Sequence, residues 1–285
     1  MPLELRDRSD CAYDVVALGE VMLRLDPGVD RIRTAQQFRV WEGGGAYNVA
    51  RALTSCFGLR SAIITSLFDN EIGRLIEGMI RRSGVDLSFL RWLPFDGVGR
   101  NARNALNFVE RGFGVRGPLG VSDRGHSASS FLLPEDIDWE HLFGELGVRC
   151  LHTVGIFTAL SASTADTAEV AMRAARKQGT LVCYDLNYRP SLWSESGGMA
   201  AAADVNRRLV DVMMGVETPG PPTKLGFADT GVVKDRIAEA TQKYPSLTAV
   251  ASTLREVHSA TINDWSALAW ARGQGYVEPL TSIWA

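Results

Sequence analysis

The amino-acid sequence predicts an α/β fold built on a mostly parallel sheet with helices on both of its faces. Short apolar runs typical of buried strands alternate with amphipathic helical patterns along most of the chain. The links between them are short, and strands that alternate with helices in this way join through crossovers into a parallel sheet. At 285 residues, of which 46% are hydrophobic, the chain is long enough for one large domain of this class.

The first strand–helix–strand unit lies near the N-terminus. Asp14–Leu18 and Ser61–Leu67 have the composition of buried strands. A helix is predicted between them over Ala46–Phe57, and Gly58 follows it as a C-cap residue would. The apolar residues at helical spacing in this segment are Val49, Leu53 and Phe57.

The same alternation continues through the middle of the chain. A second helix is predicted over Gly73–Ser83, with Gly84 after it and an apolar face of Leu75, Ile76, Met79 and Ile80. Further strands are expected at Cys150–Val154, Thr180–Tyr184, Val210–Met214 and Leu247–Ser252. The helix between the first two of these has a capping-box match, Ser163 with Asp166, and ends before Gly179.

Two stretches interrupt this rhythm. Residues 23–41 and 95–116 are too polar and too rich in turns for the central sheet, and the second contains an alternating segment at Ala105–Glu110. Both are interpreted as strands of a small separate sheet, which would serve as a lid or as an oligomer contact. Glu217–Asp229 is expected to be a proline- and glycine-rich loop.

Composition excludes several function classes. A net charge of -3 provides no basic field for nucleic acid, and no apolar run reaches the roughly 18 residues of a membrane span. The charged N-terminus lacks a hydrophobic signal core. The cysteines show no CxxC or metal-ligand spacing, so a reducing cytoplasm is the expected location; they are Cys11, Cys56, Cys150 and Cys183.

A glycine run precedes the first predicted helix. Gly43, Gly44 and Gly45 would let a ligand approach the backbone, where the first helical turn offers free N–H donors. Asn48, one turn into the helix, can donate and accept hydrogen bonds as recognition of hydroxyl groups requires. The alternative interpretation is a plain glycine turn that leads into a core helix.

Polar residues also follow the predicted strand at Thr180–Tyr184. Asp185, Asn187 and Arg189 lie at its carboxyl end, which is the end where open α/β sheets bind ligands. The alternative is a salt-bridged Asp–Arg turn that Pro190 caps. Asp123–Arg124 is a weaker candidate by itself, because charged pairs in loops are usually solvated.

Gly112–Gly117 matches the spacing GxGxxG. A dinucleotide-binding fingerprint needs a helix to begin at that point, but Pro118 follows and no amphipathic pattern starts. A nucleotide-dependent oxidoreductase therefore remains a weak alternative that rests on this motif. The sequence contains no GxxxxGK[ST] phosphate loop, and its four histidines form no metal-binding or nucleophile-activating pattern.

Several of these motifs resemble one known family. The segments GEVMLRLDP and GGGAYNVARAL, with Asp69–Gly73, are similar to the N-terminal signature of PfkB (ribokinase-family) carbohydrate kinases. LHTVGIFTALS followed by YDLNYRPSLW resembles 2-keto-3-deoxygluconate kinases in particular, and the resemblance covers about Asp14–Trp270. It implies a ribokinase-like three-layer sandwich with a small β lid, and transfer of phosphate from ATP, with Mg²⁺, to a small sugar.

The resemblance assigns roles to individual residues. Gly43, Gly44 and Asn48 would bind the sugar, and Arg124 and Arg189 would hold the acid end of the substrate. Arg24 stands where ribose and adenosine kinases have a hydroxyl-binding aspartate, which disfavours a neutral polyol. The remaining candidates are Asp185, Asn187 and Glu217 as substrate or metal support, and Thr253 and Arg255 at the nucleotide.

Three departures from the family pattern affect the nucleotide half. The glycine-rich (D)TxGAGD-type motif that supplies the base and the anion hole is absent, and the chain ends at Ala285, about where it should begin. The family's Asn-x-x-Glu corresponds to Val216–Pro219, and Arg255 replaces a glycine. We therefore expect an ATP-dependent kinase of a small acidic sugar, in a truncated copy whose activity the sequence leaves open, or alternatively a sugar-acid-binding pseudokinase without catalysis. The resemblance also implies that the lid can pair two copies in a homodimer.

Overall fold

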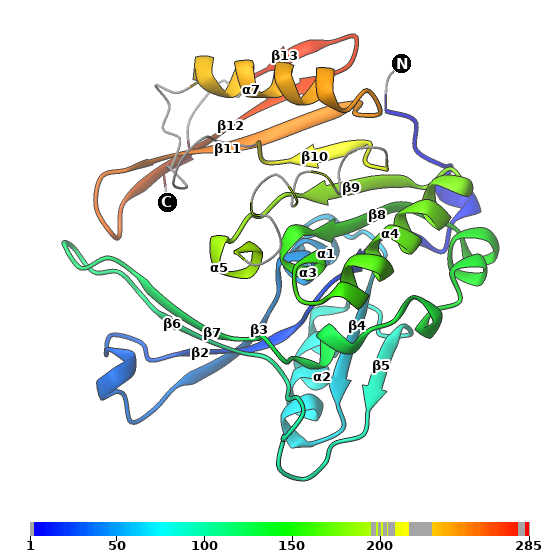
Figure 1. Cartoon of the computed structure of the whole chain (residues 1–285). Coiled ribbons are helices and arrows are strands. Elements are labelled where there is room, and N and C mark those ends of the chain that lie inside the picture. The colour runs from blue at the N-terminus through cyan, green and yellow to red at the C-terminus, as the bar shows by residue number, and fades with distance from the viewer. Residues whose placement is uncertain are drawn as a thin grey trace.

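The computed structural model describes residues 3–194, 198, 201, 204, 209–216, 230–278 and 283–284. The strands of its central sheet are β1 (Tyr13–Leu18), β4 (Ser61–Phe68), β5 (Leu90–Leu93), β8 (Val148–Val154), β9 (Leu181–Asp185), β10 (Val212–Met214), β11 (Ala249–Val257), β12 (Asn263–Ala271), β13 (Gly275–Val277) and β14 (Ile283–Trp284). Their order is β13-β12-β11-β10-β9-β8-β1-β4-β5, with β14 beside β12 (Figure 1). All neighbours from β5 to β11 pair in parallel, and β12 and β13 add an antiparallel edge. The predicted α/β class and mostly parallel sheet are confirmed.

Helices connect and cover these strands. They are α1 (Gly45–Phe57), α2 (Glu71–Ser83), α3 (Gly155–Thr158), α4 (Ala162–Lys177), α5 (Pro190–Trp193) and α7 (Thr230–Lys243). Shorter 3₁₀ or π turns occur at Arg8–Asp10, Ile32–Thr34, Ala128–Phe131, Pro134–Asp136 and His141–Gly147. Helix α1 packs on β1, β4 and β8, α4 packs on β8 and β9, and α7 packs on β12. Consecutive residues of β1 and β4 are buried, so both faces of the sheet are covered at its centre.

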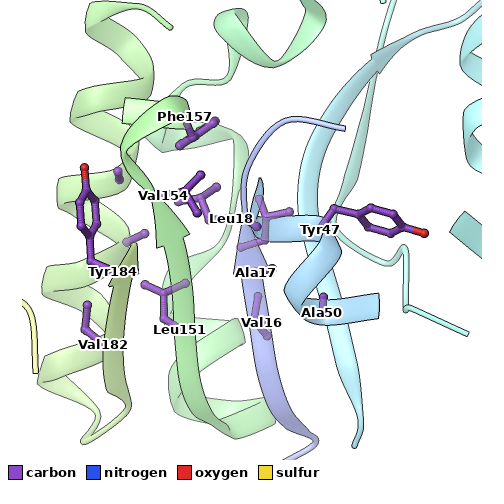
Figure 2. Packing of buried hydrophobic residues seen from close by; sticks show 14 of the residues in the cluster. Val16, Ala17, Leu18, Tyr47, Ala50, Leu151, Val154, Phe157, Val182 and Tyr184 are labelled. Atoms are coloured by element: carbon purple, nitrogen blue, oxygen red, sulfur yellow. The ribbon is translucent and has the colours of Figure 1, made fainter. Parts of the chain in front are cut away.

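The core lies where β1, β8 and β9 meet α1 and α3 (Figure 2). Val16, Leu18 and Leu151 are fully buried there, and each such side chain contributes roughly 1.5–3 kcal/mol relative to an exposed one. Tyr184 is also fully buried, and its hydroxyl lies 2.9 Å from the hydroxyl of Thr158. This core fixes the strand ends that carry the polar residues of interest.

Helix α1 buries a different face from the one that its large apolar residues suggest. The buried residues of the helix are Ala46, Tyr47 and Ala50, whereas Phe57 is 71% exposed. The approach is close, because a Cβ on Gly19 would lie 2.8 Å from the Cβ of Ala46. Small side chains allow this contact, so the predicted apolar face was wrong although the helix and its Gly58 cap were right.

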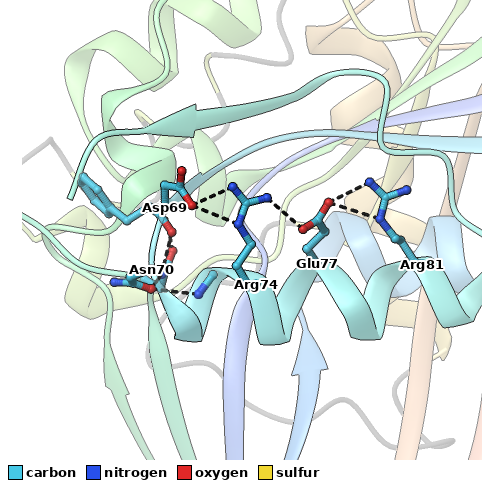
Figure 3. Close-up of polar contacts among 8 residues, drawn as sticks. Asp69, Asn70, Arg74, Glu77 and Arg81 are labelled. Carbon is cyan, nitrogen blue, oxygen red and sulfur yellow. Dashed lines mark hydrogen bonds and ion pairs between the residues drawn. The ribbon is translucent and has the colours of Figure 1, made fainter.

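Helix α2 begins with a hydrogen-bonded cap (Figure 3). The Asn70 side chain accepts from the backbone N–H of Gly73 at 2.9 Å and from Asn104 Nδ2 at 2.9 Å. Gly73 has no room for a side chain, since a Cβ would lie 2.1 Å from the carbonyl oxygen of Phe68. Of the predicted apolar face, Ile76, Met79 and Ile80 are buried and Leu75 is 37% exposed.

The N-cap of helix α4 lies two residues before the predicted one. Ser161 is the N-cap, and its hydroxyl accepts from the backbone N–H of Thr164 at 3.2 Å. Thr164 Oγ1 accepts in return from the N–H of Ser161 at 3.0 Å, which completes a capping box. The assignment of Ser163 as the cap was therefore wrong, because this residue already lies within the first turn.

The two polar stretches form a separate four-stranded sheet. Its strands are β2 (Met22–Asp26), β3 (Arg39–Gly43), β6 (Leu106–Glu110) and β7 (Leu119–Asp123), in the order β3-β2-β6-β7. The predicted small sheet is confirmed, and β7 extends it beyond residue 116. Phe113 and Arg116 exchange two backbone hydrogen bonds of 2.9 Å around a tight turn, in which Gly114 has a φ of 54°. The GxGxxG segment is thus a hairpin tip with no helix, and the dinucleotide-fingerprint interpretation was wrong.

Candidate functional site

The first part of the candidate site is the junction between β1 and α1. A Cβ on Gly44 would lie only 2.0 Å from the backbone carbonyl oxygen of Glu20, so this position has room for glycine alone. The backbone N–H of Asn48 donates to the carbonyl of Gly44 at 2.8 Å, and the Asn48 side chain is exposed. A Cβ on Gly43 would lie 4.0 Å from Asn48 Oδ1. The glycine run therefore connects the end of β3 to the first turn of α1 and lies against Glu20, just past the carboxyl end of β1.

The turn after β9 reaches the same junction. A Cβ on Gly45 would lie 3.3 Å from Asn187 Nδ2, which places the amide of Asn187 beside the glycine run. Asn187 has a φ of 34°, the one positive φ of a non-glycine residue among those that the structure describes. Asp185 Oδ1 supports this conformation by accepting from the backbone N–H of Asn187 at 3.0 Å. The structure thus brings together two motifs that lie far apart in the sequence.

A buried ion pair completes the cluster. Glu20, directly after β1, is 3% exposed, and its Oε2 lies 3.3 Å from Nε of Arg124, whose side chain is 13% exposed. Burial raises the pKa of Glu20, opposed by the charge of Arg124, and burial lowers the pKa of Arg124. Arg124 is therefore a partly buried cation after β7, in contrast to the solvated loop pair that the sequence suggested.

Arg189 and Asp185 add two further charges. Arg189 is exposed, and its charge contributes to the lowered pKa of Arg124, after burial and the opposing effect of Glu20. Burial raises the pKa of Asp185, against its hydrogen bond from Asn187 and the charge of Arg189. The charges of two guanidinium groups therefore act on one region, and guanidinium groups bind carboxylates through paired hydrogen bonds.

The other candidate residues lie apart from this cluster. Arg255, on β11, donates from Nε and Nη2 to Asn263 Oδ1 at 3.0 and 2.7 Å and lies over the ring of Trp265. Thr253 and Arg24 are exposed on β11 and β2. Glu217 and the predicted loop Glu217–Asp229 fall outside the described residues. Among the residues that are described, no three His, Cys, Asp or Glu side chains cluster as a metal site would require.

The turn between β11 and β12 contacts the tip of the small sheet. The backbone N–H of Ala260 donates to the carbonyl of Gly114 at 3.1 Å, and a Cβ on Gly112 would lie 2.7 Å from the Cβ of Ala260. Figure 1 shows the two hairpins extending to the same side of the molecule. The tip of the small sheet therefore contacts the turn that follows β11, the strand of the central sheet that carries Arg255.

Comparison with known proteins identifies the family. The model of the pfkB family of carbohydrate kinases matches residues 12–218. The chain belongs to this family. It is 30% identical to the 2-dehydro-3-deoxygalactonokinase of Haloferax volcanii over 205 residues, which are 72% of this chain and 61% of that protein. It is also 30% identical to the 2-dehydro-3-deoxygluconokinase of Thermoproteus tenax over 214 residues, 73% of this chain and 61% of that one.

Solved structures of the family have the same fold. A 2-dehydro-3-deoxygluconokinase from Thermotoga maritima is 30% identical, with a TM-score of 0.79 over 95% of this chain and 80% of that one. A fructokinase with bound ATP from Xylella fastidiosa shares the fold at 19% identity and a TM-score of 0.67, covering 93% and 77% of the two chains. The suspected family and the ribokinase-like fold are thus confirmed, while this pfkB-family chain spans about 61% of the length of the two curated relatives named above.

One residue of the cluster was missed in the sequence. Glu20 stands in the GEVMLRLDP segment, directly after a predicted buried strand. Its position at the carboxyl end of that strand, as for Asp185, was the available signal. In addition, no helix among the described residues of this pfkB-family chain is long and apolar enough to span a membrane.

Proposed function

We propose that the protein phosphorylates a hydroxyl group of a small acidic sugar of the 2-keto-3-deoxygluconate type, with ATP as the phosphate donor. The observation that carries this proposal is the buried pair of Arg124 with Glu20, whose backbone carbonyl lies against Gly44, together with the charge of Arg189, which acts on Arg124. Two guanidinium groups suit a carboxylate better than a neutral polyol. The names of the relatives, which are kinases of keto-deoxy sugar acids, support the same substrate class.

Each residue of the cluster has a role in this proposal. Gly43 and Gly44 let the sugar approach the backbone, and Asn48 and Asn187 exchange hydrogen bonds with its hydroxyl groups. Arg124, which follows β7, and Arg189, which follows β9, hold the carboxylate. Binding through these groups orients the acceptor hydroxyl, and orientation is a main source of rate in phosphoryl transfer.

The nucleotide half of the proposal rests on fewer residues. ATP with Mg²⁺ supplies the phosphoryl group and the charge that neutralises it during transfer. Thr253, exposed on β11, and Arg255 are the residues of this chain that we assign to the nucleotide. Asp185, whose carboxyl lies at the end of β9, is a candidate for metal support, and Glu217 stays a prediction.

A second candidate function is binding of the sugar acid without catalysis. The specific observations in its favour are two departures within the chain, Val216–Pro219 in place of Asn-x-x-Glu and Arg255 in place of a glycine. Loss of groups that act on the transferred phosphate reduces the rate of transfer, whereas it leaves the carboxylate-binding arginines in place. The two candidates share a substrate and differ in turnover.

Calorimetry and a coupled ADP-release assay test these candidates together. The chain is titrated with 2-keto-3-deoxygluconate and with fructose. It is then assayed with ATP and Mg²⁺, alone and after fusion to a C-terminal segment that carries a TxGAGD-type motif. Turnover by either form supports the kinase, and acid binding with no turnover by both forms supports the pseudokinase. A chain that binds neither sugar, or binds fructose more tightly, contradicts both.

Pairing of two copies through the small sheet also stays a proposal. Its edge strands β3 and β7 expose the apolar side chains Val40, Trp41, Leu119 and Val121. Exposed apolar side chains that gather on one sheet are typical of protein contacts. Sedimentation of the unchanged chain and of a Trp41→Ser, Val121→Ser variant would show a dimer that only the unchanged chain forms.

A further inference from the structure

Glu20 is fixed in place more firmly than an ordinary loop carboxylate. Its backbone carbonyl fills the space beside Gly44, where a Cβ would lie 2.0 Å away, and the preceding Gly19 abuts Ala46. The side chain is 3% exposed, between the central sheet and the segment that follows β7. The direction in which this carboxylate points is therefore set by the fold.

The ion pair that Glu20 forms is incomplete. Its Oε2 lies 3.3 Å from Arg124 Nε, but no hydrogen bond of normal geometry joins them or reaches either carboxylate oxygen from the described part of the chain. The Ser127 hydroxyl is close enough to lower the pKa of Glu20 without completing such a bond. Arg124 Nη2 lies 3.1 Å from the sulfur of Met22, which is a weak acceptor. A buried pair with unmet hydrogen bonds stabilises a fold less than apolar residues of the same size would. Stability alone does not explain the presence of this pair.

The position of Glu20 relative to the guanidinium group suggests its use. Because Glu20 lies nearest to Nε of Arg124, and Nη2 contacts only the weakly accepting sulfur of Met22, the terminal nitrogens can donate to a second partner. The nearby Arg189 adds a second positive charge, and Asn187 lies across the glycine run. A ligand carboxylate that enters this region would meet two guanidinium groups, one of which is held in a fixed orientation.

We propose that Glu20 is a positioning residue that orients Arg124 toward the carboxylate of the substrate and so favours acidic over neutral sugars. This inference deepens the proposed function and rests on it. Glu20 acts through Arg124, so its contribution should appear for ligands that carry a carboxylate and not for ligands that lack one. A role in folding alone would affect both kinds of ligand equally.

The test compares two isosteric substitutions at buried glutamates. In Glu20→Gln, the expected result is a 10-fold or greater loss of affinity for 2-keto-3-deoxygluconate in calorimetry, with the affinity for fructose unchanged within twofold. Glu110→Gln is the matched control, because Glu110 is also buried, 4% exposed, and lies 3.8 Å from Arg116 in the small sheet. It should leave both affinities unchanged.

Two further variants guard against a change in folding. Glu20→Asp keeps the charge but withdraws it by one methylene, so it should reduce acid affinity less than Glu20→Gln does. In the Arg124→Lys background, which lacks the fork that Glu20 orients, Glu20→Gln should have little additional effect, whereas a purely structural role would give additive losses. Thermal unfolding of every variant is recorded alongside.

The outcomes separate this inference from the function beneath it. If the unchanged chain binds the acid and Glu20→Gln binds it equally well, or loses both sugars in equal proportion, Glu20 is not a positioning residue and the proposed function stands. If the unchanged chain binds no sugar acid, the proposed function fails and the inference fails with it. A selective loss of acid binding that Glu20→Asp partly restores supports both.

Discussion

Strand β1 has a buried carboxylate at each end, and the two differ sharply. At its start, Asp14 accepts from the backbone N–H and Nε of Arg60 at 3.0 and 3.1 Å, and its carboxyl lies 3.2 and 3.4 Å from Arg8 and Arg149. Burial alone would raise the pKa of Asp14, but the hydrogen bonds and charge of Arg60 bring it to about 2. Just past the other end, Glu20 pairs with one arginine and accepts no hydrogen bond of normal geometry from the described residues. Burial raises its pKa, against the smaller effects of Arg124 and of the Ser127 hydroxyl.

This contrast separates a structural carboxylate from one that is available to a ligand. The start of a parallel strand lies away from the ligand-binding edge, so the charge of Asp14 is fully paired within the protein. Glu20 lies at the ligand-binding edge, where its incomplete pairing leaves polar atoms for a substrate to satisfy. The predictions below test the contrast, beginning with the largest expected effect.

Arg124→Gln should have the largest effect on ligand binding. It removes a partly buried guanidinium group that we assign to the substrate carboxylate, and hydrogen bonds to charged groups contribute about 1.5–3 kcal/mol. Affinity for 2-keto-3-deoxygluconate should fall on the order of 100-fold, which corresponds to about 2.7 kcal/mol. Calorimetry measures the loss, and Arg173→Gln on the exposed face of α4 is the control. Unchanged acid binding by Arg124→Gln would remove the basis of the substrate assignment.

Asp14→Asn should instead affect stability and leave sugar binding unchanged. A pKa lowered from 3.8 to about 2 corresponds to about 2 kcal/mol of folding free energy above pH 4. Because the folded-state pKa is below the unfolded value, this contribution is present above pH 3.8 and is lost as the pH falls toward 2. Urea unfolding of both proteins at pH 7, 4 and 3 should show a difference that narrows toward low pH. If the difference in the free energy of unfolding between the two proteins stayed constant with pH, the arginines around Asp14 would not act through charge.

Glu20→Gln should show the opposite dependence on pH. The pKa of Glu20 is raised in the folded state, so ionisation of this carboxyl destabilises the fold as the pH rises from the unfolded value of 4.5 through the raised one. The stability of the unchanged protein relative to Glu20→Gln should therefore decline over that interval. The same urea series measures it, with Asp14→Asn as the reference that changes in the other direction. Parallel trends for the two variants would contradict the contrast between the two ends of β1.

The sequence predicts the fold better than it predicts the site. Apolar runs that alternate with helical patterns located the strands from Asp14–Leu18 onward, because buried parallel strands are continuous apolar segments that can be recognised locally. The face of α1 was wrong because tight packing on β1 favours Ala46 and Ala50 over larger residues such as Phe57. Such a choice depends on a neighbouring strand, which periodicity within one helix does not reveal.

The site required partners that lie far apart in the chain. The glycine run and the turn after β9 were each recognisable as motifs, although their contact at Gly45 and Asn187 was not. Glu20 was missed because a lone glutamate after an apolar run becomes informative only when Arg124 is seen beside it. The GxGxxG spacing misled in the opposite way: the local pattern matched a dinucleotide motif, but it occurs in a hairpin where no helix begins.

The smallest change in stability is expected from a row of exposed ion pairs on α2. Comparison with the pairs of Asp14 and Glu20 shows what burial contributes. On α2, Glu77 joins Arg74 at 3.2 Å and Arg81 at 2.7 Å, and Arg74 also bonds Asp69 at 2.7 Å (Figure 3). The arginine side chains are 46% and 66% exposed, so solvent screens these charges. Arg81→Ala should change the free energy of unfolding by about 0.5 kcal/mol or less, and added salt should reduce the difference further. Urea unfolding in 0.05 and 0.5 M NaCl measures this difference. If Arg81→Ala lowered the free energy of unfolding as much as Asp14→Asn, the number of ion pairs, rather than their burial, would determine their contribution.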